Sequence, residues 1–114
     1  MPRMAITEAL PMKEISRFCA KWRIVELSLF GSAVREDFDA ASDLDMLVTF
    51  DGQSEWGLFD HVQMQQELET LLNRRVDLIS RRALDQTQNV LLRDEILRTA
   101  RVVFSQDENT HAKR

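Results

Sequence analysis

Two aspartates placed two positions apart are the residues of this chain best suited to chemistry. Asp43 and Asp45 stand at the start of an apolar run, Leu44 to Phe50, which has the composition of a buried β-strand. Side chains alternate between the two faces of a strand, so both carboxylates project from the same face. Like charges this close repel, and a divalent cation with oxygen ligands removes that cost. The pair indicates either a Mg²⁺ site or a turn cap at the start of the strand.

A Gly-Ser pair ends the apolar run that comes before. Ile24 to Phe30 predicts a short buried strand, and Gly31 with Ser32 predicts a turn directly after it. Glycine lets a phosphate approach the backbone closely, and the exposed N–H groups of such a turn bind anions together with a hydroxyl. The pair indicates either a phosphate-binding turn or an ordinary connection between strands.

A third carboxylate interrupts another apolar run. Asp77 lies in the middle of Arg75 to Ser80, which predicts a strand. A charged group inside a strand needs water or a partner. Asp77 is therefore either a solvent-facing residue of an edge strand or a third acid beside Asp43 and Asp45. In the second case it would hold a metal or accept the proton of an attacking hydroxyl.

Helices are predicted to position these strands. Apolar residues recur at helical spacing over Met12 to Lys21, Gly57 to Leu72 and Val90 to Ala100. We expect one side of the second helix to be buried, namely Leu58, Phe59, Val62, Leu68, Leu71 and Leu72. Arg101 to Phe104 predicts a short fourth strand. The alternation of helices and strands predicts an α/β fold in which helices pack on a sheet.

Composition limits the size and the partners of the molecule. The 114 residues, 44% of them hydrophobic, predict a single domain over residues 1–104, and residues 105–114 a polar tail. The net charge of −4 argues against direct nucleic-acid binding. Because we find neither a signal peptide nor an apolar run near the ~20 residues that span a bilayer, we expect a cytoplasmic protein without membrane contact. The single cysteine, Cys19, is expected to be a small buried residue.

These motifs together resemble a known signature. The Gly31-Ser32 pair, ten further residues and then Asp43-x-Asp45 resemble the pattern of the DNA polymerase beta-like nucleotidyltransferase superfamily. The phrases Leu-Phe-Gly-Ser-Ala-Val-Arg, Ser-Asp-Leu-Asp-Met-Leu-Val and Arg-Val-Asp-Leu-Ile resemble its small branch, the minimal nucleotidyltransferases (MNT). Members of that branch are paired with HEPN proteins as toxin–antitoxin systems. The resemblance runs from about Met12 to Phe104.

The resemblance implies a fold and a set of site residues. It implies a small mixed sheet of three to four strands, with Gly31 and Ser32 binding the triphosphate of ATP. It also implies that Asp43, Asp45 and Asp77 form an acidic triad that coordinates Mg²⁺, with room for a second metal ion.

The loop after the Gly-Ser pair both matches and departs from the family pattern. Arg35 matches a frequent arginine of the family, and we expect it to contact phosphate or to pair at the surface with Glu36 or Asp37. Relatives often carry a glycine where this chain has Glu36, so we expect the shape of the loop, but not the acidic triad, to depart from the family pattern.

The resemblance further implies transfer of AMP from ATP to a hydroxyl, typically of tyrosine, on a partner HEPN toxin, with this chain as its antitoxin. The chain contains no tyrosine, so a tyrosine acceptor must lie on another protein. Two alternatives are a catalytically silent module that sequesters the toxin, and an enzyme acting on a small molecule. The latter would need a second domain for its acceptor. Homo- and hetero-oligomers are both open.

Overall fold

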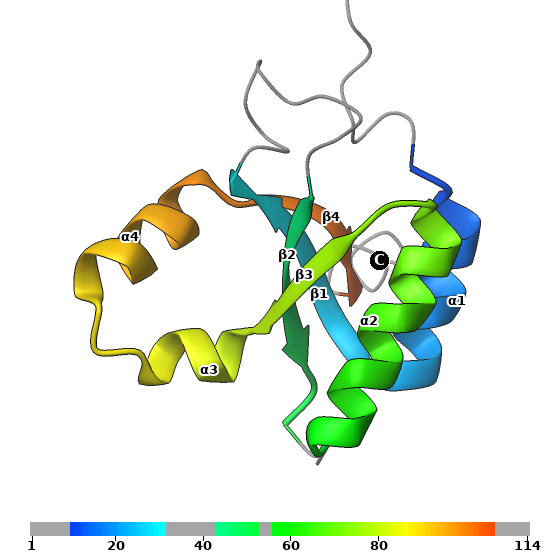
Figure 1. The fold of residues 1–114 in the computed structure, drawn as a ribbon, viewed down its shortest axis with the longest axis horizontal. Coiled ribbons are helices and arrows are strands. Elements are labelled where there is room, and N and C mark those ends of the chain that lie inside the picture. The colour runs from blue at the N-terminus through cyan, green and yellow to red at the C-terminus, as the bar shows by residue number, and fades with distance from the viewer. Residues whose placement is uncertain (1–9, 32–42, 53–55, 107–114) are drawn as a thin grey trace, which may run out of the picture.

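A four-stranded sheet forms the centre of the molecule (Figure 1). The computed structural model describes residues 10–31, 43–52 and 56–106. Within them the strands are β1 (Ile24–Phe30), β2 (Leu44–Phe50), β3 (Val76–Ser80) and β4 (Arg101–Ser105), in the spatial order β3-β2-β1-β4. The sheet is mixed, because β1 is antiparallel to both β2 and β4 whereas β2 and β3 run parallel. The expected α/β fold with a small mixed sheet is confirmed.

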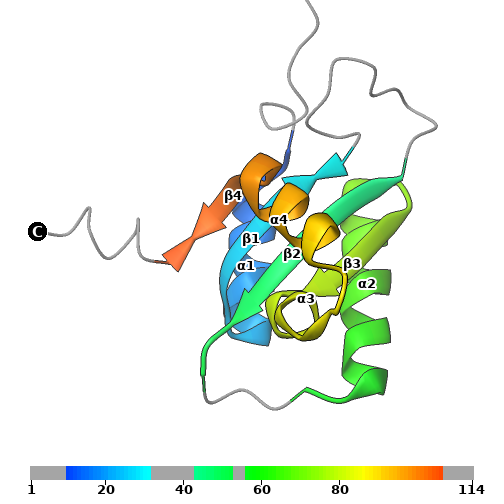
Figure 2. The same ribbon diagram turned by 90° about the vertical axis from the view of Figure 1, so that its left-hand side faces the viewer.

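Helices cover both faces of this sheet (Figures 1 and 2). The first pair, α1 (Met12–Trp22) and α2 (Leu58–Leu72), packs on one face, and α3 (Arg81–Gln86) and α4 (Val90–Thr99) lie on the other. The three long helices match the predicted segments to within one residue at each end. The short α3 was not predicted. No helix in the described part of the chain is long and apolar enough to cross a membrane.

Because side chains alternate between the two faces of the sheet, the core consists of two clusters. Leu44 and Met46 of β2 lie in the larger cluster, together with buried residues of α1, α2 and β3. Leu47 of β2 lies in the smaller one, against Leu84 of α3 and Ile96 of α4. Residues at odd positions of β2 and β3 therefore face α3 and α4. Both Asp45 and Asp77 are on this second side of the sheet.

The inner side of α1 forms as expected. Ile15, Phe18, Cys19 and Trp22 are all buried. Burial raises the pKa of the Cys19 thiol from 9.0 to about 12, because the apolar surroundings disfavour the thiolate. Cys19 therefore stays a neutral thiol at physiological pH, which confirms it as a small core residue.

The predicted inner side of α2 is partly wrong. Leu58 is 75% exposed, Phe59 90% and Val62 44%, whereas Met64 and Leu68 are the buried positions. At 3.6 residues per turn, Leu58 and Phe59 lie about 120° and 140° around the helix from Met64. The register of α2 on the sheet is set by Met64 and Leu68, so the apolar residues of its first turn face solvent.

Side chains of α2 cover the free edge of β3. Glu69 Oε2 accepts a hydrogen bond from the Val76 N–H at 3.0 Å, and Gln65 Oε1 accepts one from the Leu78 N–H at 3.4 Å. His61 Nε2 lies 2.8 Å from the Leu78 carbonyl oxygen and must donate to it, because a carbonyl oxygen only accepts. These three residues follow one another at four-residue spacing, so they lie along one side of the helix. They satisfy backbone groups that a further strand would otherwise pair with.

We expect Glu69→Ala to destabilise the fold by about 1–2 kcal/mol, because it leaves the half-covered Val76 N–H without its acceptor. Gln66 is exposed on the same helix, and its side chain makes no hydrogen bond or ion pair within the described residues. Glutamine and glutamate have similar helix propensities, so Gln66→Ala controls for the truncation of a long side chain on α2. Urea unfolding of both variants measures the difference. Equal losses of stability would show that the edge contact of Glu69 contributes nothing.

The C-terminal end departs slightly from prediction. The sequence predicts a fourth strand that ends at Phe104, but β4 continues to Ser105. Ser105 therefore belongs to the sheet and not to the predicted tail. The remainder of that tail, from residue 107 onward, lies outside the described residues.

Candidate active site

Gly31 and Asp45 are packed against each other at one end of the sheet. β1 ends at Phe30, which pairs with Asp45 of β2, and Gly31 follows with a left-handed φ of 70°. A Cβ atom added to Gly31 would overlap Asp45 Oδ2 and would lie 3.2 Å from Asp45 Cγ. The carboxylate of Asp45 therefore occupies the space that any other side chain at position 31 would need.

Asp45 and Asp77 lie side by side on neighbouring strands. They are direct partners in the parallel register of β2 and β3, whose backbones are about 4.8 Å apart at this pairing. Both face the α3 and α4 side of the sheet. Asp45 is half-buried, whereas Asp77 is exposed on the edge strand. The structure thus brings together two acids that are far apart in the sequence, with one of them open to an incoming molecule.

Asp43 lies at the same end of the sheet as Asp45 and Asp77. It is exposed and directly precedes β2, whose ladder begins when the Leu44 N–H donates to the Arg75 carbonyl oxygen at 2.9 Å. Among residues 10–31, 43–52 and 56–106, no three or more His, Cys, Asp or Glu side chains gather closely enough to hold a metal ion. The structure therefore pairs Asp45 with Asp77 and leaves Asp43 beside them.

The donor set nevertheless fits Mg²⁺. This cation is usually held by one or two carboxylates plus substrate phosphates, and it does not need a cage built wholly from protein. The adjacent Asp45 and Asp77 supply hard oxygen ligands, and the exposed Asp43 lies two residues before Asp45 at the start of β2. The other predicted phosphate contacts, Ser32 and Arg35, lie outside the described residues.

A groove next to Gly31 extends this end of the sheet. It has a volume of about 840 Å³, which is within the usual size range of ligand sites. Its lining comes from the end of β1, from α4 and from the start of β4: Phe30, Gly31, Leu92, Glu95, Ile96, Arg98, Thr99, Ala100 and Arg101. Sequence patterns did not indicate the contribution of α4, because only the fold brings this helix to the end of β1.

A second hollow lies at the opposite end of β2 and holds none of the predicted site residues. Its volume is about 440 Å³, and its wall includes Phe50 and Trp56. The Trp56 ring meets Trp22 edge to face with a centroid separation of 5.1 Å, and its indole N–H donates to the Trp22 carbonyl oxygen at 2.9 Å. Trp56 therefore has a packing role in the described structure, away from the three aspartates.

Comparison with known proteins gives a family match and two curated relatives. Residues 12–103 match the family model "Nucleotidyltransferase domain". Two proteins of Methanocaldococcus jannaschii, each described as a "putative protein adenylyltransferase", are similar to this chain. One is 34% identical over 89 residues, which are 77% of this chain and 88% of the relative. The other is 30% identical over 64 residues, 56% of this chain, and the match spans 64% of that relative's length.

Solved structures share the fold. A protein described as a "putative minimal nucleotidyltransferase" superposes with a TM-score of 0.64 at 33% identity, covering 89% of this chain and 98% of that one. A chain from the complex of a tri-AMPylated Shewanella oneidensis HEPN toxin with MNT antitoxin superposes with a TM-score of 0.57 at 17% identity. This second match covers 88% of this chain and 74% of the other. At that identity the similarity is one of fold.

Proposed function

The chain belongs to the nucleotidyltransferase domain family, and on this premise we propose that it transfers AMP from ATP, with Mg²⁺, to a hydroxyl of a HEPN-type partner protein. The observation that carries the proposal is the pairing of Asp45 with Asp77 on neighbouring strands, with Asp45 packed against Gly31, which itself lines the groove. Two acids on adjacent strands beside a turn that can approach phosphate are the parts that nucleotidyl transfer requires.

Each residue has a role in this proposal. Asp45 and Asp77 would hold Mg²⁺, joined by Asp43 from beside the pair, and the bound cation would neutralise phosphate charge and orient the triphosphate. Gly31 leaves room for Asp45 and lets the phosphates approach the backbone. Ser32 and Arg35 would donate hydrogen bonds to the triphosphate.

The exposed position of Asp77 suits proton transfer. An acceptor hydroxyl can reach this edge strand from solvent, and a carboxylate oxygen of Asp77 would take its proton. The hydroxyl oxygen then forms a bond to the α-phosphorus of ATP, while the bond to the departing pyrophosphate breaks.

The acceptor is placed on a partner because this chain has no tyrosine. The shared fold with a chain from a complex that contains a tri-AMPylated HEPN toxin supports a HEPN-type protein as that partner. We propose that the hydroxyl is that of a tyrosine and that the modification silences the toxin, with this chain as its antitoxin.

The test uses ATP labelled at either the α- or the γ-phosphate, incubated with the chain and the HEPN-type protein of the same genome. We expect label on the partner only from the α-position. Chelation with EDTA should abolish the labelling, and added Mg²⁺ should restore it. Label from the γ-position would instead indicate phosphoryl transfer, and labelling that survives EDTA would contradict the role of the metal.

A further inference from the structure

The first turn of α4 begins with three consecutive apolar residues. Its opening residues, Val90, Leu91 and Leu92, are 49%, 83% and 49% exposed. Three consecutive helical residues point in three directions about 100° apart, so no single contact with the sheet can cover them. Of the ten residues of α4 only Ile96 is buried. The other four apolar residues of the helix, Val90, Leu91, Leu92 and Leu97, stay exposed.

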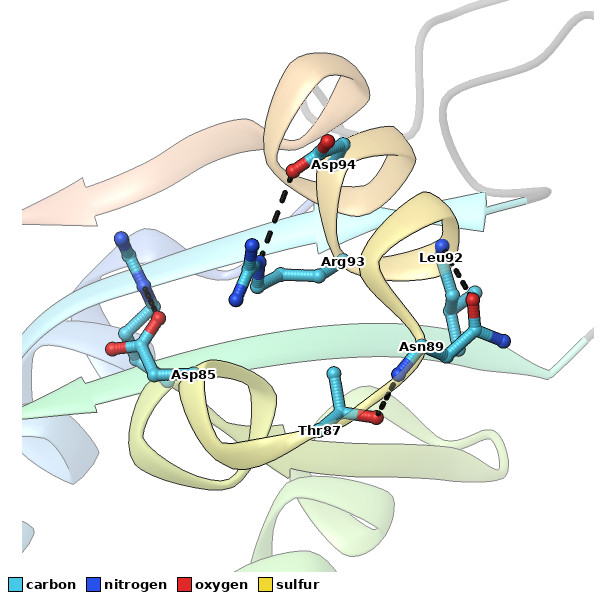
Figure 3. A network of polar contacts seen from close by, with 7 residues as sticks. Asp85, Thr87, Asn89, Leu92, Arg93 and Asp94 are labelled. Carbon is cyan, nitrogen blue, oxygen red and sulfur yellow. Dashed lines mark hydrogen bonds and ion pairs between the residues drawn. The ribbon is translucent and has the colours of Figure 1, made fainter.

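The exposed turn is held in a defined position. Figure 3 shows that Asn89 caps the helix, with its Oδ1 accepting from the Leu92 N–H at 3.1 Å. The Asn89 N–H in turn donates to Thr87 Oγ1 at 3.3 Å. The apolar side chains therefore project from an ordered helix start, and a partner that covers them need not first order the helix.

This surface is continuous with the candidate active site. Leu92 lines the same groove as Gly31, and α4 lies on the face of the sheet to which Asp45 and Asp77 belong. We define the α4 surface as the exposed apolar residues of α4, namely Val90, Leu91, Leu92 and Leu97. A molecule seated there would border the groove.

A second apolar patch is in the wrong place for the reaction. Leu58, Phe59 and Val62 are exposed at the start of α2, which follows the C-terminal end of β2. The strand bounds place the aspartates at the opposite, N-terminal ends of β2 and β3. Figure 1 shows both strands running from that end of the sheet toward the end where α2 begins. Of the two patches, only the α4 surface contributes a residue, Leu92, to the groove that Gly31 lines.

The charges of α4 favour a neutral, apolar partner surface. Arg98 pairs with Glu95 at 3.1 Å and Arg93 with Asp94 at 3.8 Å, so the helix carries two positive and two negative charges that offset each other. A polyanion such as RNA requires an uncompensated basic patch, which α4 does not present. An apolar protein surface needs no basic patch on α4 to bind it.

From these observations we infer that the α4 surface is the docking site for the acceptor protein, which covers it with an apolar patch adjoining the reactive hydroxyl. This inference rests on the proposed function, because that function places the acceptor on a partner. Docking on α4 holds the partner on the face of the sheet that carries Asp45 and Asp77. The surface thus determines which protein is modified.

The experiment compares two charged substitutions at nearly fully exposed apolar positions, Leu91→Glu in the α4 surface and Phe59→Glu in the α2 patch. Affinity for the HEPN-type protein is measured by calorimetry without ATP. We expect Leu91→Glu to weaken binding about 30-fold or more, which is the effect of losing a central contact. Phe59→Glu should change it less than about twofold, and both variants should unfold at the wild-type temperature.

Two results would overturn the inference. The first is that Leu91→Glu binds the partner as tightly as the wild type. The second is that the wild-type chain self-associates in analytical ultracentrifugation and Leu91→Glu does not, because the surface would then join two copies of this chain. The outcomes also separate the two proposals. If the partner binds through α4 but receives no AMP, the proposed function fails and the docking site stands. If Leu91→Glu binds and labels the partner normally, the docking site fails and the function stands.

Discussion

Replacing Asp45 by asparagine is expected to lower the rate of AMP transfer about 10³-fold or more. The substitution keeps the size of the side chain that is packed against Gly31 but removes its charge. A lost carboxylate ligand costs several kcal/mol of stabilisation for the phosphate charge, and each 1.36 kcal/mol corresponds to a factor of ten in rate. The rate is measured as label transferred from the α-phosphate of ATP to the partner.

Asp60→Asn is the matched control for this substitution. Asp60 lies at the start of α2, where its Oδ2 accepts a hydrogen bond from the Gly57 N–H at 2.9 Å, and an asparagine oxygen can still accept it. The control should keep the transfer rate within about twofold. Partner binding should be unchanged in both variants, because Asp45 lies outside the α4 surface. A rate for Asp45→Asn close to that of wild type would remove Asp45 from the chemistry.

The second large effect is expected from Gly31→Ala. Alanine at the left-handed φ of 70° costs about 1–2 kcal/mol, and its Cβ would displace the Asp45 carboxylate. Because a misplacement of about 1 Å can cost about 100-fold in rate, we expect the transfer rate to fall by roughly that factor. Thermal unfolding measures the loss of stability, and α-phosphate labelling measures the rate.

Gly52→Ala provides the comparison. A Cβ added to Gly52 meets no atom within 4 Å, so this variant tests the removal of a glycine without a clash. It should retain the wild-type rate. If Gly31→Ala transferred AMP as fast as Gly52→Ala, the close packing of Gly31 on Asp45 would have no part in catalysis.

Local patterns were sufficient to predict the strands that carry the candidate site. Ile24–Phe30 and Leu44–Phe50 form at the predicted positions, because each is a short apolar run bounded by turn residues. The position of Asp43 and Asp45 together at the start of β2 likewise follows from the sequence alone. Their proposed roles, and those of Asp77, Ser32 and Arg35, remain predictions to be tested by substitution.

Features that depend on the packing of distant segments could not be predicted. The register that places Asp77 next to Asp45 is a property of the β2–β3 pairing, which no local pattern encodes. The short α3 has only one buried residue, Leu84, so its apolar periodicity is too weak to detect. The Ser80 side chain that accepts from the Ala83 N–H is a capping signal that could have indicated it.

Local patterns also could not predict which sides of α2 and α4 are exposed. The helical spacing of apolar residues predicts that Leu58 and Phe59 are buried, but the core contacts of α2 are made by Met64 and Leu68. In α4 the apolar residues are spread around the helix, and the sheet buries only Ile96. Which apolar residues remain exposed depends on where each helix is anchored, and it is these residues that indicate a docking surface.

The most direct test is the intact mass of the HEPN-type partner after co-expression with the wild-type chain or with Asp45→Asn. We predict that the partner gains the mass of at least one AMP with the wild type and none with the variant, while it co-purifies with both. A partner that co-purifies with the wild-type chain, is silenced by it and carries no added mass would contradict adenylyl transfer. The chain would then act by sequestering its partner.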